Sequence, residues 1–109
     1  MIHTTLRMVI PWEKQREVIK ILTRTVERTR VEQGCISCHF YSDLQDKRGF
    51  MLEEIWETND DFARHLRSDD FRNVLVVAET ALEAPDIIFS DVIPGNGIEA
   101  IKKLRRATA

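Results

Sequence analysis

The sequence predicts an α+β fold of the ferredoxin-like type, in which the elements follow in the order β-α-β-β-α-β. Three observations support this prediction. Four short segments carry the apolar patterns of strands, two longer stretches between them carry apolar residues at helical spacing, and proline, glycine or a capping residue stands at the boundaries. In this split βαβ arrangement the helical stretches can cover only one face of the sheet.

The chain begins with a strand and a long helix. Apolar residues recur at every second position over residues 2–10, which predicts a half-buried strand. Pro11 ends this strand and suits the first position of a helix. Helical spacing continues from residue 12 to about residue 33, and Gly34 is well placed as the residue that follows the end of the helix. The apolar stripe of this helix consists of Val18, Ile19, Leu22 and Val26.

The middle of the chain predicts a hairpin and a capped helix that together carry most of the candidate chemistry. Residues 35–42 form the second predicted strand, residues 43–49 a polar loop, and the third strand follows. One face of the third strand carries Phe50, Leu52, Glu54 and Trp56. Thr58 or Asn59 is the N-cap of the next helix, in which Phe62 and Leu66 share a face and His65 lies beside them. A carboxylate, an indole and an imidazole can therefore converge on one pocket.

The last third of the chain predicts a second half of this helix, a strand and a tail. Ser68 caps the second half, whose apolar stripe runs to Leu82 and is stopped by Pro85. Residues 86–93 form the fourth predicted strand. A break at residues 94–97 precedes a short amphipathic helix. The predicted domain therefore spans residues 1–93, and residues 94–109 form a C-terminal tail.

Both faces of the predicted sheet carry apolar side chains. The residues that indicate this are Ile36, Cys38 and Phe40 in the second strand and Met51 and Ile55 in the third. An open apolar face of that size would aggregate, so a cover is required. A second copy of the same sheet is the simplest cover, which predicts a homodimer through the sheet faces.

Composition sets the class of protein. A chain of 109 residues with 43% hydrophobic and 31% charged residues is one globular domain with a modest core. A net charge of −2 lacks the excess of positive charge that is typical of nucleic-acid-binding proteins, so no nucleic-acid partner is expected. The N-terminal residues lack the layout of a signal peptide and no apolar run could span a bilayer, which favours a cytoplasmic location. Two cysteines in such a chain are expected to be reduced.

The run from Cys35 to His39 matches C-x-x-C-H, the attachment signature of c-type haem. The motif falls where a strand is predicted, and residues three apart on a regular strand point to opposite faces. We therefore expect Cys35 and Cys38 to be free thiols and the protein to be colourless. The basic tail helix is under three turns long, so we expect its apolar stripe to pack on the dimer and do not expect membrane binding.

Three short motifs resemble the antibiotic biosynthesis monooxygenase domain family. They are the run from Glu32 to Ser37, the triplet Glu54-Ile55-Trp56 and the segment from His65 to Phe71, and the similarity extends over residues 2–93. The resemblance implies a dimeric α+β barrel in which each subunit holds a pocket between its sheet and helices. Characterised members include cofactor-independent monooxygenases of quinols or polycyclic aromatics, haem-degrading enzymes and enzymes that process a signalling sugar phosphate.

The resemblance implies roles for particular residues. Carried over by position, the catalytic candidates are His65 as the base, Trp56 as a wall of the pocket and Glu54 as the group that orients His65 or the substrate. Partial burial is expected to lower the pKa of His65 and keep it neutral, and His65→Ala is expected to remove turnover while the fold stays intact. The substrate-binding candidates are Leu52, Phe62, Phe71, Leu75, His39 and Tyr41. Neither a cofactor nor a metal is implied.

Two departures narrow the expected reaction. Leu52 stands where the polyketide monooxygenases carry asparagine, and Leu75 stands about where the haem-degrading branch carries its iron-ligating histidine. The expected function is cofactor-independent oxidation of a small quinol-like or aromatic substrate with molecular oxygen.

Other functions remain open alternatives. One is a non-catalytic small-molecule binding or sensing domain on the same barrel, and another is an enzyme acting on a small phosphorylated metabolite. Convergence of His65, Trp56 and Glu54 would favour an enzyme. An empty, dry pocket with His65 turned to solvent would favour the binding domain. The structural alternative for the three candidate residues is that His65 is a half-buried surface histidine that caps its helix, Trp56 is a core residue and Glu54 pairs with an arginine.

Overall fold

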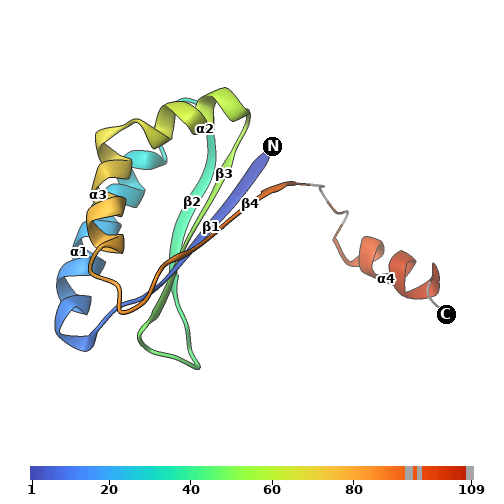
Figure 1. Cartoon of the computed structure of the whole chain (residues 1–109). Coiled ribbons are helices and arrows are strands. Elements are labelled where there is room, and N and C mark those ends of the chain that lie inside the picture. Colours follow the sequence, from blue (N-terminus) through green and yellow to red (C-terminus); the bar gives the residue numbers. More distant parts are fainter. Residues whose placement is uncertain (93–94, 96, 108–109) are drawn as a thin grey trace.

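The computed structural model describes residues 1–92, 95 and 97–107, and its element order confirms the predicted fold class. The elements are β1 (Ile2–Val9), α1 (Trp12–Thr29), β2 (Cys35–Ser42), β3 (Gly49–Trp56), α2 (Asn59–Leu66), α3 (Asp69–Ala78), β4 (Asp86–Asp91) and α4 (Ile98–Ala107). The strands form one sheet in the order β2-β3-β1-β4, and each neighbouring pair is antiparallel. Helices α1, α2 and α3 lie on one side of this sheet (Figure 1). This is the ferredoxin-like arrangement.

The core lies between the sheet and helices α1 and α3. Alternate residues of β1 and β3 point toward the helices, and the amphipathic stripes of α1 and α3 pack onto them. The buried core residues are Leu6, Met8, Ile10, Val18, Leu22, Val26, Cys38, Phe50, Leu52, Val74 and Val77.

Helix α1 ends earlier than the sequence predicts. It stops at Thr29, so Gly34 is not the residue that ends the helix but lies in the following loop with φ +83. Arg30 is the C-cap: its backbone N–H still donates to the carbonyl of Val26 at 3.1 Å, and its Nε donates to the carbonyl oxygen of Cys38 on β2 at 2.8 Å. Glu32 lies in the loop that follows and contacts His65 of helix α2.

A β-bulge in β2 corrects the expected placement of the two cysteines. The register shifts between Cys35 and Ser37, so Cys35 lies opposite Trp56 and Cys38 lies opposite Glu54. Trp56 and Glu54 are two residues apart on β3, and both cysteines therefore face the helices rather than opposite sides. Both are free thiols in the structure, as expected, although the argument from regular strand geometry was wrong.

Two further boundaries differ from the sequence prediction. Helix α3 ends at Ala78, well before Pro85, because the chain turns there and the backbone N–H of Leu82 donates to the carbonyl of Val9 at 2.8 Å. Strand β4 ends at Asp91, and the predicted boundary between residues 93 and 94 lies outside the described residues. Helix α4 lies apart from the sheet and the other helices (Figure 1).

The face of the sheet away from the helices is more polar than the sequence suggested. Cys38 and Phe40 pack against the core, and Ile36 lies in the bulge. Met51, Ile55 and Ile88 remain on the open face, together with an ion pair of 2.9 Å between His3 and Glu53. Among the described residues, no helix combines the length and apolar character needed to cross a membrane.

Candidate active site

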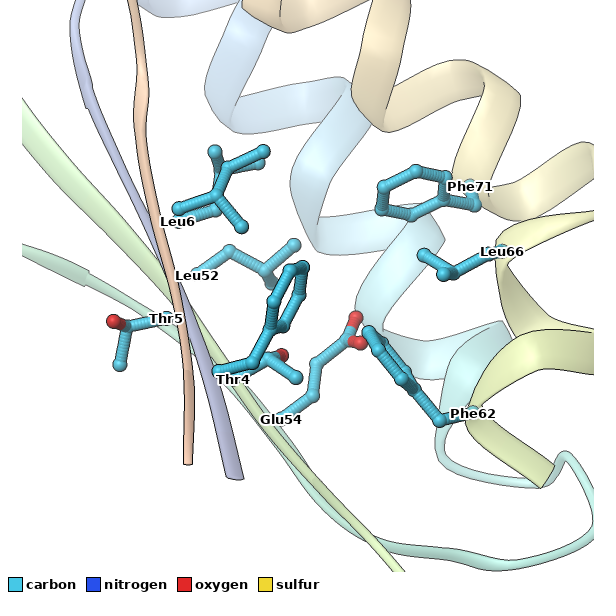
Figure 2. A pocket seen from close by; sticks show the side chains of 10 residues that line it. Thr4, Thr5, Leu6, Leu52, Glu54, Phe62, Leu66 and Phe71 are labelled. Carbon is cyan, nitrogen blue, oxygen red and sulfur yellow. The ribbon is translucent and has the colours of Figure 1, made fainter. Parts of the chain in front are cut away.

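An apolar cavity lies between the sheet and helices α2 and α3 (Figure 2). Its volume is about 40 Å³, room for roughly three water molecules. Phe62 of α2 and Phe89 of β4, which both line the cavity, meet edge to face with ring centroids 5.5 Å apart. A space of this size is too small for an aromatic ring, so an aromatic substrate would require the lining side chains to move apart. The lining residues are Thr4, Thr5, Leu6, Leu52, Glu54, Phe62, Leu66, Phe71, Ile87 and Phe89.

Glu54 is the one ionisable side chain among the described residues that line this cavity. It projects from β3 and is only 3% exposed. Its Oε1 accepts a hydrogen bond of 3.0 Å from Trp56 Nε1, and its Oε2 lies 3.2 Å from His65 Nε2. A buried carboxylate is stable only when such donors satisfy its oxygens. The cavity therefore holds a fixed proton acceptor in apolar surroundings.

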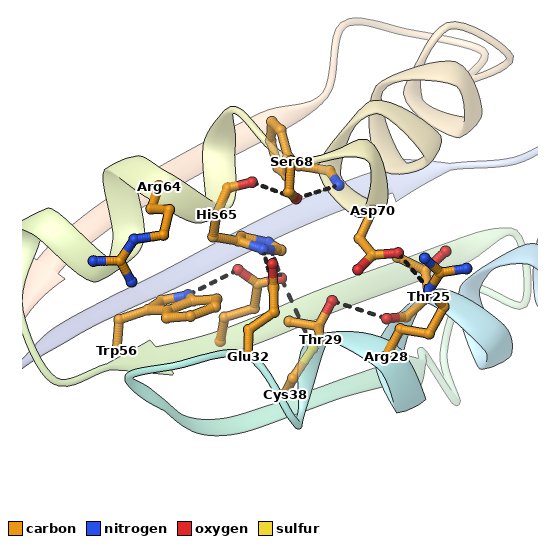
Figure 3. Close-up of polar contacts among 12 residues, drawn as sticks. Thr25, Arg28, Thr29, Glu32, Cys38, Trp56, Arg64, His65, Ser68 and Asp70 are labelled. Atoms are coloured by element: carbon orange, nitrogen blue, oxygen red, sulfur yellow. Dashed lines mark hydrogen bonds and ion pairs between the residues drawn. The ribbon is translucent and has the colours of Figure 1, made fainter.

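His65 of α2 is 1% exposed and lies beside Trp56 and Glu32 (Figure 3). Its ring stacks on Trp56 at 4.6 Å between centroids and meets the edge of Phe71 at 5.5 Å. Its Nδ1 lies 2.6 Å from Oε2 of Glu32, so the imidazole bridges two carboxylates. Thr58 and Ser68 cap α2 and α3 and thereby fix the helical segment that presents His65.

The pKa of His65 is shifted in the direction opposite to that expected from its burial alone. Burial lowers the pKa of His65, but its hydrogen bonds and attraction to Glu54 and Glu32 outweigh burial, and the net effect raises its pKa above the ordinary value of 6.5. The expectation of a lowered pKa was therefore wrong. The side chain is also buried in the core, so we expect His65→Ala to lower the stability of the fold rather than to leave it unaffected.

The structure brings together six of the nine predicted site residues. Glu54, Leu52, Phe62 and Phe71 line the cavity, whereas Trp56 and His65 contact Glu54 and do not line it. Trp56 is therefore not a wall of this cavity, and the role of His65 as the base stays a prediction.

The other three predicted residues lie elsewhere because of their strand parity or helix face. Leu75 is 47% exposed on α3. His39 and Tyr41 face away from the helices, where His39 contacts Arg30 and Tyr41 contacts Glu53. They do not line the cavity.

Sequence reasoning missed Glu32 and the lining contributed by β1 and β4. Glu32 and His65 are 33 positions apart, and no local pattern indicates their contact. Glu32 does belong to the run that carries the family resemblance, which was the available signal. Phe89 lies opposite Thr4 in the sheet, so its place at the cavity follows only from the strand order.

A second recess lies on the far side of His65. Its volume is about 100 Å³, and it is lined by Glu32, Gln33, Trp56, Asp61, Arg64 and His65. Among the described residues, no group of three or more His, Cys, Asp or Glu side chains is arranged to hold a metal ion.

Gly34 positions the loop that carries Glu32. Its carbonyl accepts a hydrogen bond of 2.8 Å from the backbone N–H of Glu57, and Asp61 packs directly over its α-carbon. We predict that Gly34→Ala lowers the free energy of unfolding by at least about 1–3 kcal/mol, because a side chain is strained at this positive φ and the added Cβ would overlap the Asp61 carboxyl.

Urea unfolding measures this effect, and Gly95→Ala is the matched control. A Cβ at Gly95 would make only an ordinary contact with Ala100. If the two variants were equally stable, the packing of Asp61 over Gly34 would not be important.

The two thiols are predicted to react slowly in the folded protein. Burial, then the charges of Glu54 and Glu32, raises the pKa of Cys35 to about 11 from 9.0, which lowers its thiolate fraction near neutral pH by about 100-fold. Burial and Glu54 raise the pKa of Cys38 as well. A chromogenic disulfide reagent at neutral pH should therefore react with both thiols only after denaturation. Rapid reaction of either thiol in the native protein would contradict this prediction.

The fold and the site together define a class of protein: a ferredoxin-like α+β domain with an aromatic-lined cavity over a buried, hydrogen-bonded carboxylate. Residues 1–75 match the sequence profile of the antibiotic biosynthesis monooxygenase family. The chain belongs to this family.

The chain is also similar to individual proteins. The chain is 27% identical over 73 residues to an uncharacterized protein of Synechocystis sp., a match that covers 67% of this chain and spans half of that protein's length. A solved structure named antibiotic biosynthesis monooxygenase superposes with a TM-score of 0.79 at 22% identity, covering 86% of this chain and all of that one. A conserved protein from Methanosarcina mazei Go1 also gives 0.79 at 22% identity, covering 84% of this chain and 92% of that one. The two structural likenesses show the fold.

Proposed function

We propose that this protein is an oxidoreductase, a monooxygenase that oxidises a small quinol-like aromatic substrate with molecular oxygen and needs no cofactor. The observation that carries the proposal is the placement of Glu54, a hydrogen-bonded carboxylate that forms the polar floor of a cavity lined by phenylalanine and aliphatic side chains. Aromatic walls suit a planar ring, and a buried base suits an acidic hydroxyl. Family membership supports the same reaction class.

The proton acceptor is the pair of Glu54 and His65 rather than either residue alone. Glu54 faces the cavity and receives the proton of the substrate hydroxyl, and His65 Nε2, 3.2 Å behind it, shares that proton. Because the pKa of His65 is raised above 6.5, the pair takes up a proton readily near neutral pH and is a base of useful strength there. The convergence of Glu54, His65 and Trp56 favours an enzyme over a binding domain.

The proposed reaction balances without an external reductant. The substrate anion transfers one electron to O₂, and the ring radical and superoxide combine to form a carbon–oxygen bond. The resulting peroxide recovers the proton held by Glu54 and His65. The O–O bond then breaks, the ring C–H proton leaves, and hydroxide and this proton form water. A hydroquinone and O₂ thus give a hydroxyquinone and water, and no net proton is released.

Oxygen uptake across a panel of hydroquinones and dihydroxynaphthalenes tests this function. We expect at least one compound to consume O₂ and yield one hydroxyquinone per O₂, well above its autoxidation in buffer. Compounds that bind, as shown by quenching of tryptophan fluorescence, without any O₂ uptake would indicate the alternative, a small-molecule binding domain. If no compound of the panel bound to the protein and none caused O₂ uptake, the proposed substrate class would be refuted.

We also propose that the protein is a homodimer in which the open face of the sheet packs on a second copy. Met51, Ile55 and Ile88 lie on this face, and Ile88 of β4 is 61% exposed. The exposed apolar stripe of α4, which includes Ile98 and Ile101, can extend this contact. The interface should bury more than about 1,000 Å². Sedimentation at micromolar concentration should give a dimer, and a monomer would refute this proposal.

A further inference from the structure

Glu32 contacts His65 but takes no part in the proposed reaction as described above. It lies in the loop between α1 and β2, and its Oε2 is 2.6 Å from Nδ1 of His65. This is the shorter of the two contacts that the imidazole makes, since Nε2 lies 3.2 Å from Glu54. The carboxylate of Glu32 can only accept here, so Nδ1 must carry the proton.

We propose that Glu32 is a positioning residue of the proposed active site: by accepting the Nδ1 proton it fixes the tautomer and ring orientation of His65 and leaves Nε2 to exchange a proton with Glu54. This inference rests on the proposed function for its effect on turnover. Its effect on His65 itself can be measured without any substrate.

The arrangement also explains how a buried base can be kept in an apolar core. When His65 is protonated, its charge and that of Glu54 cancel inside the protein, so the remaining negative charge stays on Glu32. The side chain of Glu32 is 25% exposed and borders the second recess, where water can solvate it. Glu32, the solvent-accessible residue of the network, thus carries the net charge, and the buried Glu54 faces the cavity.

Other groups around His65 do not offer an alternative partner for Nδ1. Trp56 of β3 and Phe71 of α3 contribute ring faces and edges. In the recess, Arg64 donates to Asp61, and that carboxylate also accepts from Thr58. On β2, Cys38 Sγ lies 3.8 Å from Glu54, and Cys35 lies close enough to feel the charge of Glu54. Glu32 alone among these described neighbours contacts Nδ1.

The test compares Glu32→Gln with the wild type, with Glu57→Gln as the matched control and Glu32→Asp as the conservative variant. Glu57 is an exposed carboxylate at the end of β3, so its replacement removes the same charge outside the network. Full-length protein with isotope-labelled histidine gives the titration of the His65 ring by NMR. Oxygen uptake with a quinol that the wild type oxidises gives the pH profile.

Glu32→Gln should move the titration midpoint of His65 to lower pH, because an attractive carboxylate is lost. In the wild type, turnover should rise as pH rises through the pKa of His65, since the pair must be deprotonated to act as a base. In Glu32→Gln this rise in turnover should occur at lower pH. The maximal rate should also fall about 10- to 100-fold, the range for loss of a charge-assisted hydrogen bond. Glu57→Gln should match the wild type, and Glu32→Asp should restore part of both effects.

An unchanged His65 titration in Glu32→Gln would overturn the inference, and so would a moved titration with wild-type turnover at every pH. A loss of rate at every pH, with no shift in the pH at which turnover rises, would indicate a merely structural role for Glu32 and would also overturn the inference. If the wild type oxidised no quinol, the proposed function would fail, and the NMR titration would still decide whether Glu32 controls His65.

Discussion

Replacing His65 with alanine is expected to lower the free energy of unfolding by about 3–5 kcal/mol, the range for breaking a buried charged pair by removing one partner. The imidazole is 1% exposed and lies between Trp56 and Phe71, so its removal leaves a cavity. It also leaves Glu54, itself 3% exposed, without its cationic partner. Urea unfolding near neutral pH measures the loss.

His39→Ala provides the control for this prediction. His39 is exposed on the open face of the sheet and contacts Arg30, so its replacement should change stability by no more than about 1 kcal/mol. Equal stabilities for the two alanine variants would show that the network around His65 does not stabilise the fold.

The stabilising effect of His65 should also depend on pH. Its folded-state pKa is raised above the ordinary 6.5, so this contribution is fully present below the unfolded pKa and is lost as pH rises through the folded pKa. The difference in stability between the wild type and His65→Ala should therefore be larger near about pH 6 than near about pH 9. A difference that grew with pH would contradict the raised pKa.

Replacing Glu54 with glutamine is expected to lower turnover by about 10²–10⁴-fold, the typical effect of losing a positioned base. The amide keeps the shape of the side chain but cannot take up a proton. Its oxygen can still accept from Trp56 Nε1, and its NH₂ can donate to a neutral His65 Nε2. The fold should therefore lose only about 1 kcal/mol, the difference between a charged and a neutral hydrogen bond.

The two readouts separate chemistry from folding. Oxygen uptake with the best quinol gives the rate, and urea unfolding of the same preparation gives the stability. Glu53→Gln is the control, because Glu53 lies on the same strand but faces the open side, where it pairs with His3. A Glu54→Gln variant with wild-type turnover would remove Glu54 from the mechanism.

The sequence by itself determined the fold class and half of the site. The caps at Thr58 and Ser68 and the alternation along β3 are local signals, because a helix start or a strand face depends on residues only a few positions apart. They were enough to place Glu54 and Trp56 on the same face of the third strand, directly before the helix that carries His65; the structure showed that this face is the covered one.

Only the tertiary structure decided which of these residues faces the cavity and what surrounds it. The bulge between Cys35 and Ser37 changes which side chains of β2 face the core, and a one-residue shift of register is invisible in an alternating pattern. Phe89 reaches the cavity through the pairing of β4 with β1, and Glu32 reaches His65 because α1 ends early. These contacts join segments far apart in the chain, so their physical cause is the packing of the whole domain.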